Sequence, residues 1–318
     1  MDPRLARGEE ELVAQAASEG AVAPPGRDGS ASLSRKPFGV RVRRALDSVG
    51  GRTFAIAFII LLYGPLVMLA VFSFNDSIVF SLPWSGFTTK WYQEALGDEN
   101  LRGAIRNSLL VASVVAPASV ILGTLAAYPI TRLRFKLRGA AAIVVAAPLV
   151  VPWLVIGISA LIYFSKVGVA LSWATVVPMH IVVTFPLVTV LVAASLARFD
   201  RTQEESAIDL GASQLQVLRH VLLPHVAPAL IASFILAFSW SFNNFEISYF
   251  VGGFDRLFPV WVYSTLRHAT NLPIVNAIST LVSIAEVALV YGAWLLITWR
   301  AGARTSKEKT ETLMDAIR

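Results

Sequence analysis

Residues 204–224 read EESAIDLGASQLQVLRHVLLP and separate two long apolar runs. The stretch carries four acidic or basic side chains, a central glycine at 211 and a closing proline at 224. Glycine costs about 1 kcal/mol relative to alanine inside a helix, but it permits a sharp turn or a positive φ. The pattern therefore predicts two helical pieces, 205–210 and 212–222, that are separated at Gly211. Leu215, Leu218 and Leu222 form an apolar stripe on the second piece.

The sequence around this stretch is unusually apolar. The 318-residue chain is 55% hydrophobic and 15% charged, and its mean hydropathy is +0.63, whereas a soluble domain has about 25% charged residues. The apolar residues lie in six blocks, most of them long enough to cross about 30 Å of hydrocarbon as a helix. The sixth block extends backwards through a segment with one carboxylate. The sequence predicts an all-α, polytopic membrane protein with six transmembrane helices, built on blocks 53–75, 107–131, 139–165, 167–197, 226–245 and 287–299.

The distribution of Lys and Arg predicts the orientation of these spans. From Arg35 onward, eighteen Lys and Arg residues fall in the flank before the first span, the loop after the second span, the loop with residues 204–224 and the C-terminal tail. The other three loops hold six. Both termini and the 201–224 segment are therefore expected on the cytoplasmic side of a bacterial plasma membrane. This bias also explains the net charge of +6, so that no nucleic-acid partner is expected.

Three regions are predicted from composition. Residues 1–51 are rich in small and polar residues and are expected to form a disordered cytoplasmic tail. Residues 52–300 are expected to form the six-helix transmembrane domain, and residues 301–318 a cytoplasmic tail. The first span reads as an uncleaved anchor, because no cleavage site of a signal peptide follows it.

Several chemistries find no support in the residues. Cysteine is absent, which excludes disulfides and thiolate metal sites. The chain has no phosphate-binding loop and no His-Glu-x-x-His motif, and its four histidines are scattered. We expect no catalytic residues, no metal and no cofactor in this chain, which is not expected to be an enzyme.

Details within the spans can be predicted as well. Prolines at 148, 152, 178, 186 and 228 predict kinked helices. Small residues, Gly123 and Gly157 among them, are expected to let helices approach closely. The segment WYQEAL (91–96) is expected to form a short helix at the outer interface, and Asn107 or Ser108 to cap the second span.

The 204–224 stretch resembles the EAA loop of ABC importer permeases. The motif is carried by Glu205, Ser206, Ala207, Gly211, Val221, Leu223 and Pro224. The resemblance implies the type I permease fold of ABC importers and makes residues 201–224 a coupling helix that docks on a cytoplasmic ATPase. It also implies the partners, namely a second homologous permease, two ATPase subunits that bind ATP and Mg²⁺, and an extracytoplasmic solute-binding protein. Membrane lipid would surround the spans.

Downstream segments resemble the C-type permease of spermidine/putrescine importers. They include SFNNFEISYFVGG (241–253) and LPIVNAISTL (272–281). The resemblance implies polyamine transport, although this chain has Asn243 and Asn244 where that pattern has paired acidic residues. Another small solute, such as an amino acid derivative or a cationic osmolyte, is the alternative within the same transporter class. The residues expected along the substrate pathway are Trp240, Asn243, Asn244, Glu246, Tyr249 and Glu286.

The two carboxylates within spans are functional candidates, because charge is costly in the membrane. Trp240, Asn243 and Glu246 recur at steps of three, so they are expected on neighbouring faces of one helix. A carboxylate, an amide and an indole suit a cationic solute. The alternative is that Glu246 faces water at the outer end of its span. For Glu286, a structural hydrogen-bonded role is favoured over contact with substrate.

Two rivals from other classes remain. A secondary transporter or channel working alone would be expected to show inverted repeats and more paired charges at the midplane. A membrane enzyme would need a nucleophile, a base or a metal set, which the residues do not supply.

Overall fold

The computed structural model describes residues 49–78, 84–268 and 272–317. The predicted disordered tail therefore lies outside the described residues, except for its last three, which belong to the first described helix. By its internal contacts the chain divides into residues 1–62 and residues 63–318. The description below of how helices pack concerns the second unit.

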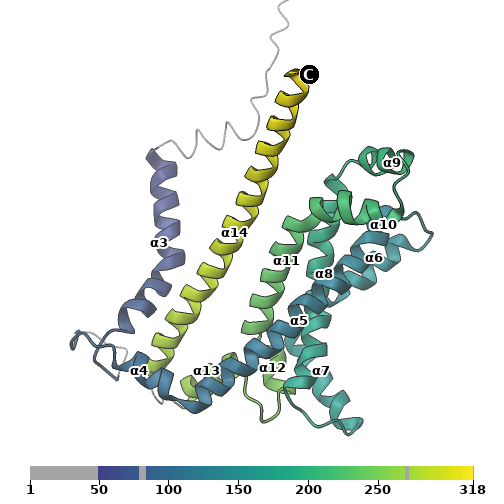
Figure 1. Cartoon of the computed structure of the whole chain (residues 1–318). Helices are drawn as coiled ribbons and strands as arrows, with labels where there is room; N and C mark the ends of the chain where they lie inside the picture. The colour runs from purple at the N-terminus through teal and green to yellow at the C-terminus, as the bar shows by residue number, and fades with distance from the viewer. Residues whose placement is uncertain (1–48, 79–83, 269–271, 318) are drawn as a thin grey trace, which may run out of the picture. The chain divides into compact units, whose positions relative to one another are not determined.

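The described part of the chain is built from helices that alternate between long and short (Figure 1). In chain order they are α3 (Val49–Phe72), α4 (Lys90–Gly97), α5 (Glu99–Arg132), α6 (Arg138–Ala146), the 3₁₀ helix η1 (Ala147–Leu149), α7 (Trp153–Lys166), α8 (Trp173–Arg198), α9 (Arg201–Asp209), α10 (Gln214–Val217), the π-helix η2 (Leu218–Leu222), α11 (Leu223–Asn243), α12 (Phe245–Val251), α13 (Phe258–Arg267) and α14 (Leu272–Ile317).

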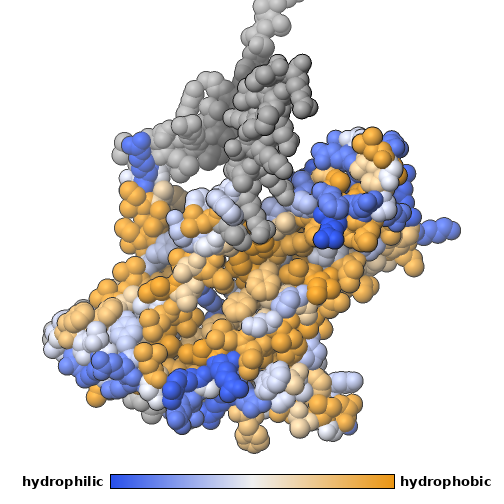
Figure 2. Space-filling view, in the orientation of Figure 1, coloured by the Kyte–Doolittle hydropathy of each residue, from blue (hydrophilic) through white to orange (hydrophobic). Residues whose placement is uncertain are grey.

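Within the described residues, five helical segments are long and apolar enough to cross a membrane, and a bent helix pair is a sixth candidate. The five are Gly51–Phe72, Glu99–Arg132, Trp173–Arg198, Gln214–Asn243 and Leu272–Trp299. Figure 2 shows hydrophobic residues over the middle of the bundle and hydrophilic residues gathered towards its ends. This distribution suits a bundle whose apolar belt faces lipid. The fold is therefore all-α and multi-pass, as predicted.

The third predicted span, 139–165, is not one helix. α6 with η1 and α7 meet at a break over residues 150–152 and are bent by 90°. Pro148 and Pro152 flank this break, and proline lacks the N–H that would continue the helical ladder. The predicted kink at these prolines is confirmed. The chain leaves the helix here and starts a new one, so the change of direction is larger than a bend within one helix. Pro178, Pro186 and Pro228 lie inside helices α8 and α11.

The core of the bundle lies where α5, α8 and α11 pack together. Ala116, Val188 and Ala237, one from each helix, have no exposed surface and belong to one apolar cluster. A Cβ on Gly123 would lie 2.7 Å from Val188 Cβ and 2.9 Å from the Phe185 carbonyl oxygen. Only a glycine therefore fits at this crossing of α5 and α8, as the small-residue pattern predicts.

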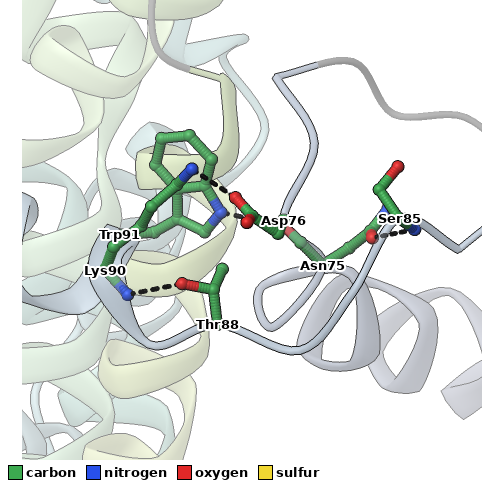
Figure 3. A network of polar contacts seen from close by, with 6 residues as sticks. All are labelled: Asn75, Asp76, Ser85, Thr88, Lys90 and Trp91. Atoms are coloured by element: carbon green, nitrogen blue, oxygen red, sulfur yellow. Dashed lines mark hydrogen bonds and ion pairs between the residues drawn. The ribbon is translucent and has the colours of Figure 1, made fainter.

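The end of the bundle that holds α4 is organised by polar contacts of the segment after α3 (Figure 3). The Trp91 indole N–H donates to the Asn75 carbonyl oxygen at 2.8 Å, and the Ser85 amide donates to Asn75 Oδ1 at 3.0 Å. Lys90 forms an ion pair with Asp76. The short helix predicted around WYQEAL is confirmed as α4.

The second span begins earlier than predicted. Its helix, α5, starts at Glu99, and the Asp98 side chain caps it by accepting from the amides of Asn100 and Leu101. The predicted cap at Asn107 or Ser108 is therefore wrong. Their polar groups instead contact the loop before α13, because Ser108 Oγ accepts from the Phe258 amide at 2.9 Å. Polar residues in a helix near a span end can thus serve tertiary contacts.

Candidate functional site: the 201–224 segment and the helix break at Asn244

Residues 201–224, which we call the hairpin segment, form two short helices at the end of the bundle opposite α12 and α13 (Figure 1). Asp200 caps α9, and its Oδ1 accepts from the Thr202 amide at 3.0 Å. Hydrogen bonds from the backbone and side chain of Thr202 lower the pKa of Asp200. Ser213 and Gln216 form a capping box at the start of α10. Both helices thus start at defined caps, which fixes the turn between them.

Gly211 makes that turn. Its φ is +88°, in the left-handed region, and no atom lies within 4 Å of an added Cβ. The Gly211 amide donates to the Ile208 carbonyl at 2.8 Å, and the Ala212 amide donates to the Ala207 carbonyl at 3.0 Å. These bonds close α9 with a C-cap of the kind that favours glycine. The break and the positive φ predicted at Gly211 are confirmed.

The hairpin segment exposes large apolar side chains. Leu210 is 90% exposed and Leu215 is 72% exposed, and Ile208 and Leu218 are also exposed. Leu222 is 3% exposed, so the predicted stripe divides between the bundle core and the surface. An exposed apolar cluster on a polar projection is typical of a protein contact surface. Neither Leu210 nor Ile208 belongs to the EAA pattern, and the apolar residues beside a glycine turn are the signal that could have identified them.

The end of the hairpin segment is a π-helix, η2. Pro224 has no N–H to donate to the carbonyl four residues before it. The Leu223 amide donates to the Leu218 carbonyl, five residues back, which widens this turn into a π-bulge. Such bulges occur often at functional sites. The closing proline of the hairpin segment thus follows a widened backbone turn.

The remaining motif residues lie along the same segment. Glu205, Ser206 and Leu223 are exposed, whereas Ala207 and Val221 are half-buried. The seven motif residues are therefore close in the chain and form a short surface element, on which the exposed members face outward from the bundle.

The hairpin segment is attached to the end of α5. The Arg132 guanidinium and the Glu204 carboxylate form an ion pair with a 2.6 Å separation between Nη2 and Oε1, and their side chains are 7% and 17% exposed. The Arg201 guanidinium donates to the Thr131 carbonyl at 2.8 Å. Sequence reasoning missed Arg132 and Glu204, because no spacing rule relates residues so far apart in the chain.

The fifth predicted span, about 226–250, is interrupted at Asn244. α11 ends at Asn243 and α12 begins at Phe245, and the buried Asn244 side chain accepts from the Ile247 amide at 3.0 Å. The prediction that Trp240, Asn243 and Glu246 lie on neighbouring faces of one helix is therefore wrong, since the helix ends before Glu246. Asparagine is a favoured N-cap, which explains the restart.

The predicted pathway residues separate into different roles around this break. Asn243 Nδ2 donates to the Ser239 carbonyl at 3.1 Å and to Glu286 Oε1. Glu286 therefore links α14 to α11 through a hydrogen bond, which agrees with the structural role that its sequence context favours. Trp240 packs edge-on against Trp153 of α7, with 5.0 Å between ring centroids. Tyr249 is 43% exposed, and its ring centroid lies 5.6 Å from that of Tyr263 in an edge-on arrangement.

Glu246 is half-buried in the first turn of α12. The N-terminal end of a helix stabilises a negative charge there. In the described part of the chain its carboxylate has no ion-pair partner. The backbone carbonyl oxygen of Glu246 would lie 3.1 Å from a Cβ on Gly157. α7 and α12 therefore pack closely here, as the small residue at 157 predicts. The arrangement leaves a carboxylate that can attract a cation.

A buried histidine holds the broken helix together, and the sequence pattern did not identify it. His180 of α8 has no exposed surface. Its Nδ1 lies 2.9 Å from Ser241 Oγ of α11, and its Nε2 lies 3.3 Å from Ser248 Oγ of α12. One side chain therefore bridges both sides of the break. Within the described residues, no group of three His, Asp or Glu could hold a metal ion.

These observations define a class first: an all-α, multi-pass membrane protein with a turn-linked helix pair at one end, one carboxylate (Glu286) inside a span and another (Glu246) in the short helix that follows a span. Residues 119–298 match the family described as "Binding-protein-dependent transport system inner membrane component". The chain belongs to this family of transporter membrane components, which are not themselves enzymes.

Relatives match along most of the chain. The putrescine transport system permease protein PotI of Escherichia coli K12 is 35% identical over 81% of this chain and 92% of that protein. The spermidine/putrescine permease protein PotC of the same strain is 32% identical over 78% of this chain and 94% of its own length. PotC of Haemophilus influenzae is 31% identical over 72% of this chain and 89% of its own.

Solved structures share the fold at lower identity. A bacterial ABC transporter that imports the acidic polysaccharide alginate matches with a TM-score of 0.57 and 19% identity, over 77% of this chain and 96% of that chain. An amino acid ABC transporter matches with a TM-score of 0.52 and 16% identity, over 66% of this chain and 98% of that chain. The fold is that of the permeases of ABC importers.

Proposed function

We propose that this chain is the permease subunit of an ATP-driven importer of polyamines. The observation that carries the proposal is the 35% identity to a putrescine permease over 92% of that protein. Glu246 supports it, because its half-buried carboxylate in the first turn of α12 has no ion-pair partner among the described residues and can attract a cation. The same chemistry would also serve a cationic osmolyte or an amino acid derivative, which are the competing substrates.

We propose an orientation in which the hairpin segment and both termini are cytoplasmic. The excess of Lys and Arg near the ends of the spans on this side supports it. The contact between Arg201 and Thr131 supports it further, since it joins two of the basic regions at one end of the bundle.

In this orientation the hairpin segment docks on a cytoplasmic ATPase subunit. The exposed Leu210 and Leu215 supply an apolar contact, and Glu205 and Gly211 supply the charge and the turn. ATP and Mg²⁺ bind to two such ATPase subunits and not to this chain. A second, homologous permease completes the membrane domain, and an extracytoplasmic binding protein delivers the solute on the opposite side of the plasma membrane.

Docking is tested with two leucine substitutions. Burying a leucine contributes about 1.5–3 kcal/mol, so we expect Leu215→Glu to weaken binding of the ATPase subunit to the purified permease by about 10- to 100-fold. Leu137→Glu is the matched control, because Leu137 is 71% exposed and Leu215 is 72% exposed, and Leu137 lies outside the hairpin segment. Equal loss in both variants, or no loss in either, would contradict docking at this segment.

The substrate is tested with Glu246→Gln, which keeps the shape of the side chain and removes its charge. A hydrogen bond to a charged group contributes about 1.5–3 kcal/mol, so the apparent uptake constant should rise by roughly one to two decades. The measurement is uptake of labelled putrescine and spermidine by the reconstituted complex, with competition by amino acid derivatives and quaternary ammonium osmolytes. Unchanged uptake in Glu246→Gln removes this carboxylate from the pathway. If one of the other solutes competed more strongly than the polyamines, that solute would be the inferred substrate instead.

A further inference from the structure

The ion pair between Arg132 of α5 and Glu204 of α9 is largely shielded from water, unlike the pair between Arg102 and Glu99 within α5. Its side chains are 7% and 17% exposed, whereas Arg102 and Glu99 are 59% and 90% exposed with their charges 3.6 Å apart. Removing charges from water is costly, and replacing a buried pair by apolar residues is often neutral or stabilising. Stability alone therefore gives little reason for a charged pair at this position.

The surroundings of the pair connect three parts of the bundle. The Arg132 guanidinium carbon lies 5.6 Å from the centre of the Phe199 ring, and Phe199 precedes α9 directly. The Phe199 ring lies 4.5 Å from the His225 ring of α11. The end of α5, the start of the hairpin segment and the start of α11 thus meet at one cluster, which we call the Arg132 junction.

The contact attaches α9 to the end of α5. The guanidinium Nη2 and the carboxylate Oε1 lie 2.6 Å apart, and both side chains are largely shielded from water. An attraction between charges that are shielded from water is stronger than one between exposed charges. The pair is therefore a firm attachment between α9 and α5. The bond from Arg201 to the Thr131 carbonyl is a second attachment of α9 to the same turn of α5.

α5 reaches from this junction to the other end of the bundle. It has 34 residues, which at 1.5 Å per residue is about 51 Å. Near its start, Ser108 Oγ accepts from the Phe258 amide at 2.9 Å, and Asn107 donates to the Arg256 carbonyl at 3.2 Å. A displacement of α5 therefore acts directly on the loop between α12 and α13 and on the start of α13.

We infer that Arg132 and Glu204 transmit movement of the hairpin segment to α5, and through α5 to the opposite end of the permease. The inference rests on the proposed docking of the hairpin segment on an ATPase. Arg132 and Glu204 are positioning residues in this scheme, since neither needs to touch ATP or the solute.

The experiment uses the assembled complex of both permeases, the ATPase subunits and the binding protein. Three quantities are measured: ATPase binding, basal ATP hydrolysis, and stimulation of hydrolysis by the solute-loaded binding protein. The Glu204 side chain is only 17% exposed and pairs with Arg132, so it is not part of the exposed surface of Leu210 and Leu215 that is proposed to dock. In Glu204→Gln we therefore expect normal ATPase binding and basal hydrolysis, with stimulation reduced about tenfold, within the 5- to 150-fold range typical of coupling between sites. Glu99→Gln, which breaks the exposed pair of the same helix, is the control and should leave stimulation unchanged.

Two double variants separate transmission from structural support. Arg132→Glu with Glu204→Arg reverses the charges and should recover most of the stimulation lost in either single reversal. Arg132→Met with Glu204→Leu should assemble and bind ATPase but remain poorly stimulated. Full stimulation in the apolar double variant, or in Glu204→Gln, would overturn the inference.

The readouts also keep this inference apart from the docking proposal. Weakened ATPase binding in Leu215→Glu, together with normal stimulation in Glu204→Gln, leaves docking intact and refutes transmission through the Arg132 junction. Normal ATPase binding in Leu215→Glu refutes docking itself. Should Glu204→Gln fail to assemble, the charge-reversed pair supplies the deciding measurement: assembly without recovered stimulation contradicts transmission.

Discussion

Gly211 offers the sharpest test of how the hairpin segment works, because replacing it would introduce strain in the backbone alone. Its φ is +88°, and nothing lies within 4 Å of an added Cβ. A side chain at this position therefore meets no neighbour, and its whole cost comes from the left-handed conformation. That cost is about 1–2 kcal/mol for an ordinary residue and smaller for asparagine, which tolerates this region.

The expected effect follows from that cost. A change of 1–2 kcal/mol alters an equilibrium about 5- to 30-fold, so we expect Gly211→Val to reduce the affinity of the permease for its ATPase by this factor or more. Gly211→Ala should lie near the lower end and Gly211→Asn close to the native protein. Membrane levels should be normal in all three, since the turn lies outside the spans.

The measurement is ATPase binding to purified permease in nanodiscs, followed by uptake in reconstituted vesicles. Gly139→Val is the matched control. A Cβ on Gly139 also meets nothing within 4 Å, but its φ is not positive. Equal affinities for the Asn, Ala and Val variants would refute the argument from backbone conformation, and a loss in Gly139→Val would show that added bulk is the cause.

Three further predictions concern packing, topology and the pathway. Gly123→Ala should lower the thermal midpoint in detergent by several degrees, because overpacking costs about 1–3 kcal/mol, whereas Gly103→Ala, with nothing within 4 Å of its Cβ, should not; equal midpoints would contradict the crossing. A cysteine replacing Gln216 should resist an impermeant reagent added outside intact cells, and one replacing Asp98 should react; the reverse pattern would invert the topology. Glu286→Gln should keep the thermal midpoint, because an amide oxygen still accepts from Asn243, and Glu286→Leu should lower it; a loss in Glu286→Gln would show that the charge matters.

Local rules predicted the parts of this protein that depend on neighbouring residues. The break at Gly211 follows from the conformational freedom of glycine, and the observed φ of +88° confirms it. Block length and hydropathy predicted an all-α membrane protein with six spans, and the described residues hold five such helices and one bent pair that is a sixth candidate. The close crossing at Gly123 followed from residue size alone.

The predictions failed where the hydrogen-bond partner of a polar side chain depends on the tertiary fold. The sequence pattern does not distinguish Asn244 from the other polar residues near it. In the structure its side chain caps α12 by accepting from the Ile247 amide. Ser108 was expected to cap a helix and instead accepts from the Phe258 amide, 150 positions further along the chain. Both residues can make either kind of bond, and periodicity cannot distinguish between them.

The sequence by itself determined the membrane class, the helical content and the turn at Gly211, because these follow from hydropathy, span length and backbone freedom, which are properties of short segments. Only the tertiary structure decided that Glu204 pairs with Arg132, that His180 bridges Ser241 and Ser248, and that Asn243 bonds to Glu286. The physical reason is that a buried polar group must find a partner, and which group lies within reach depends on how the helices cross.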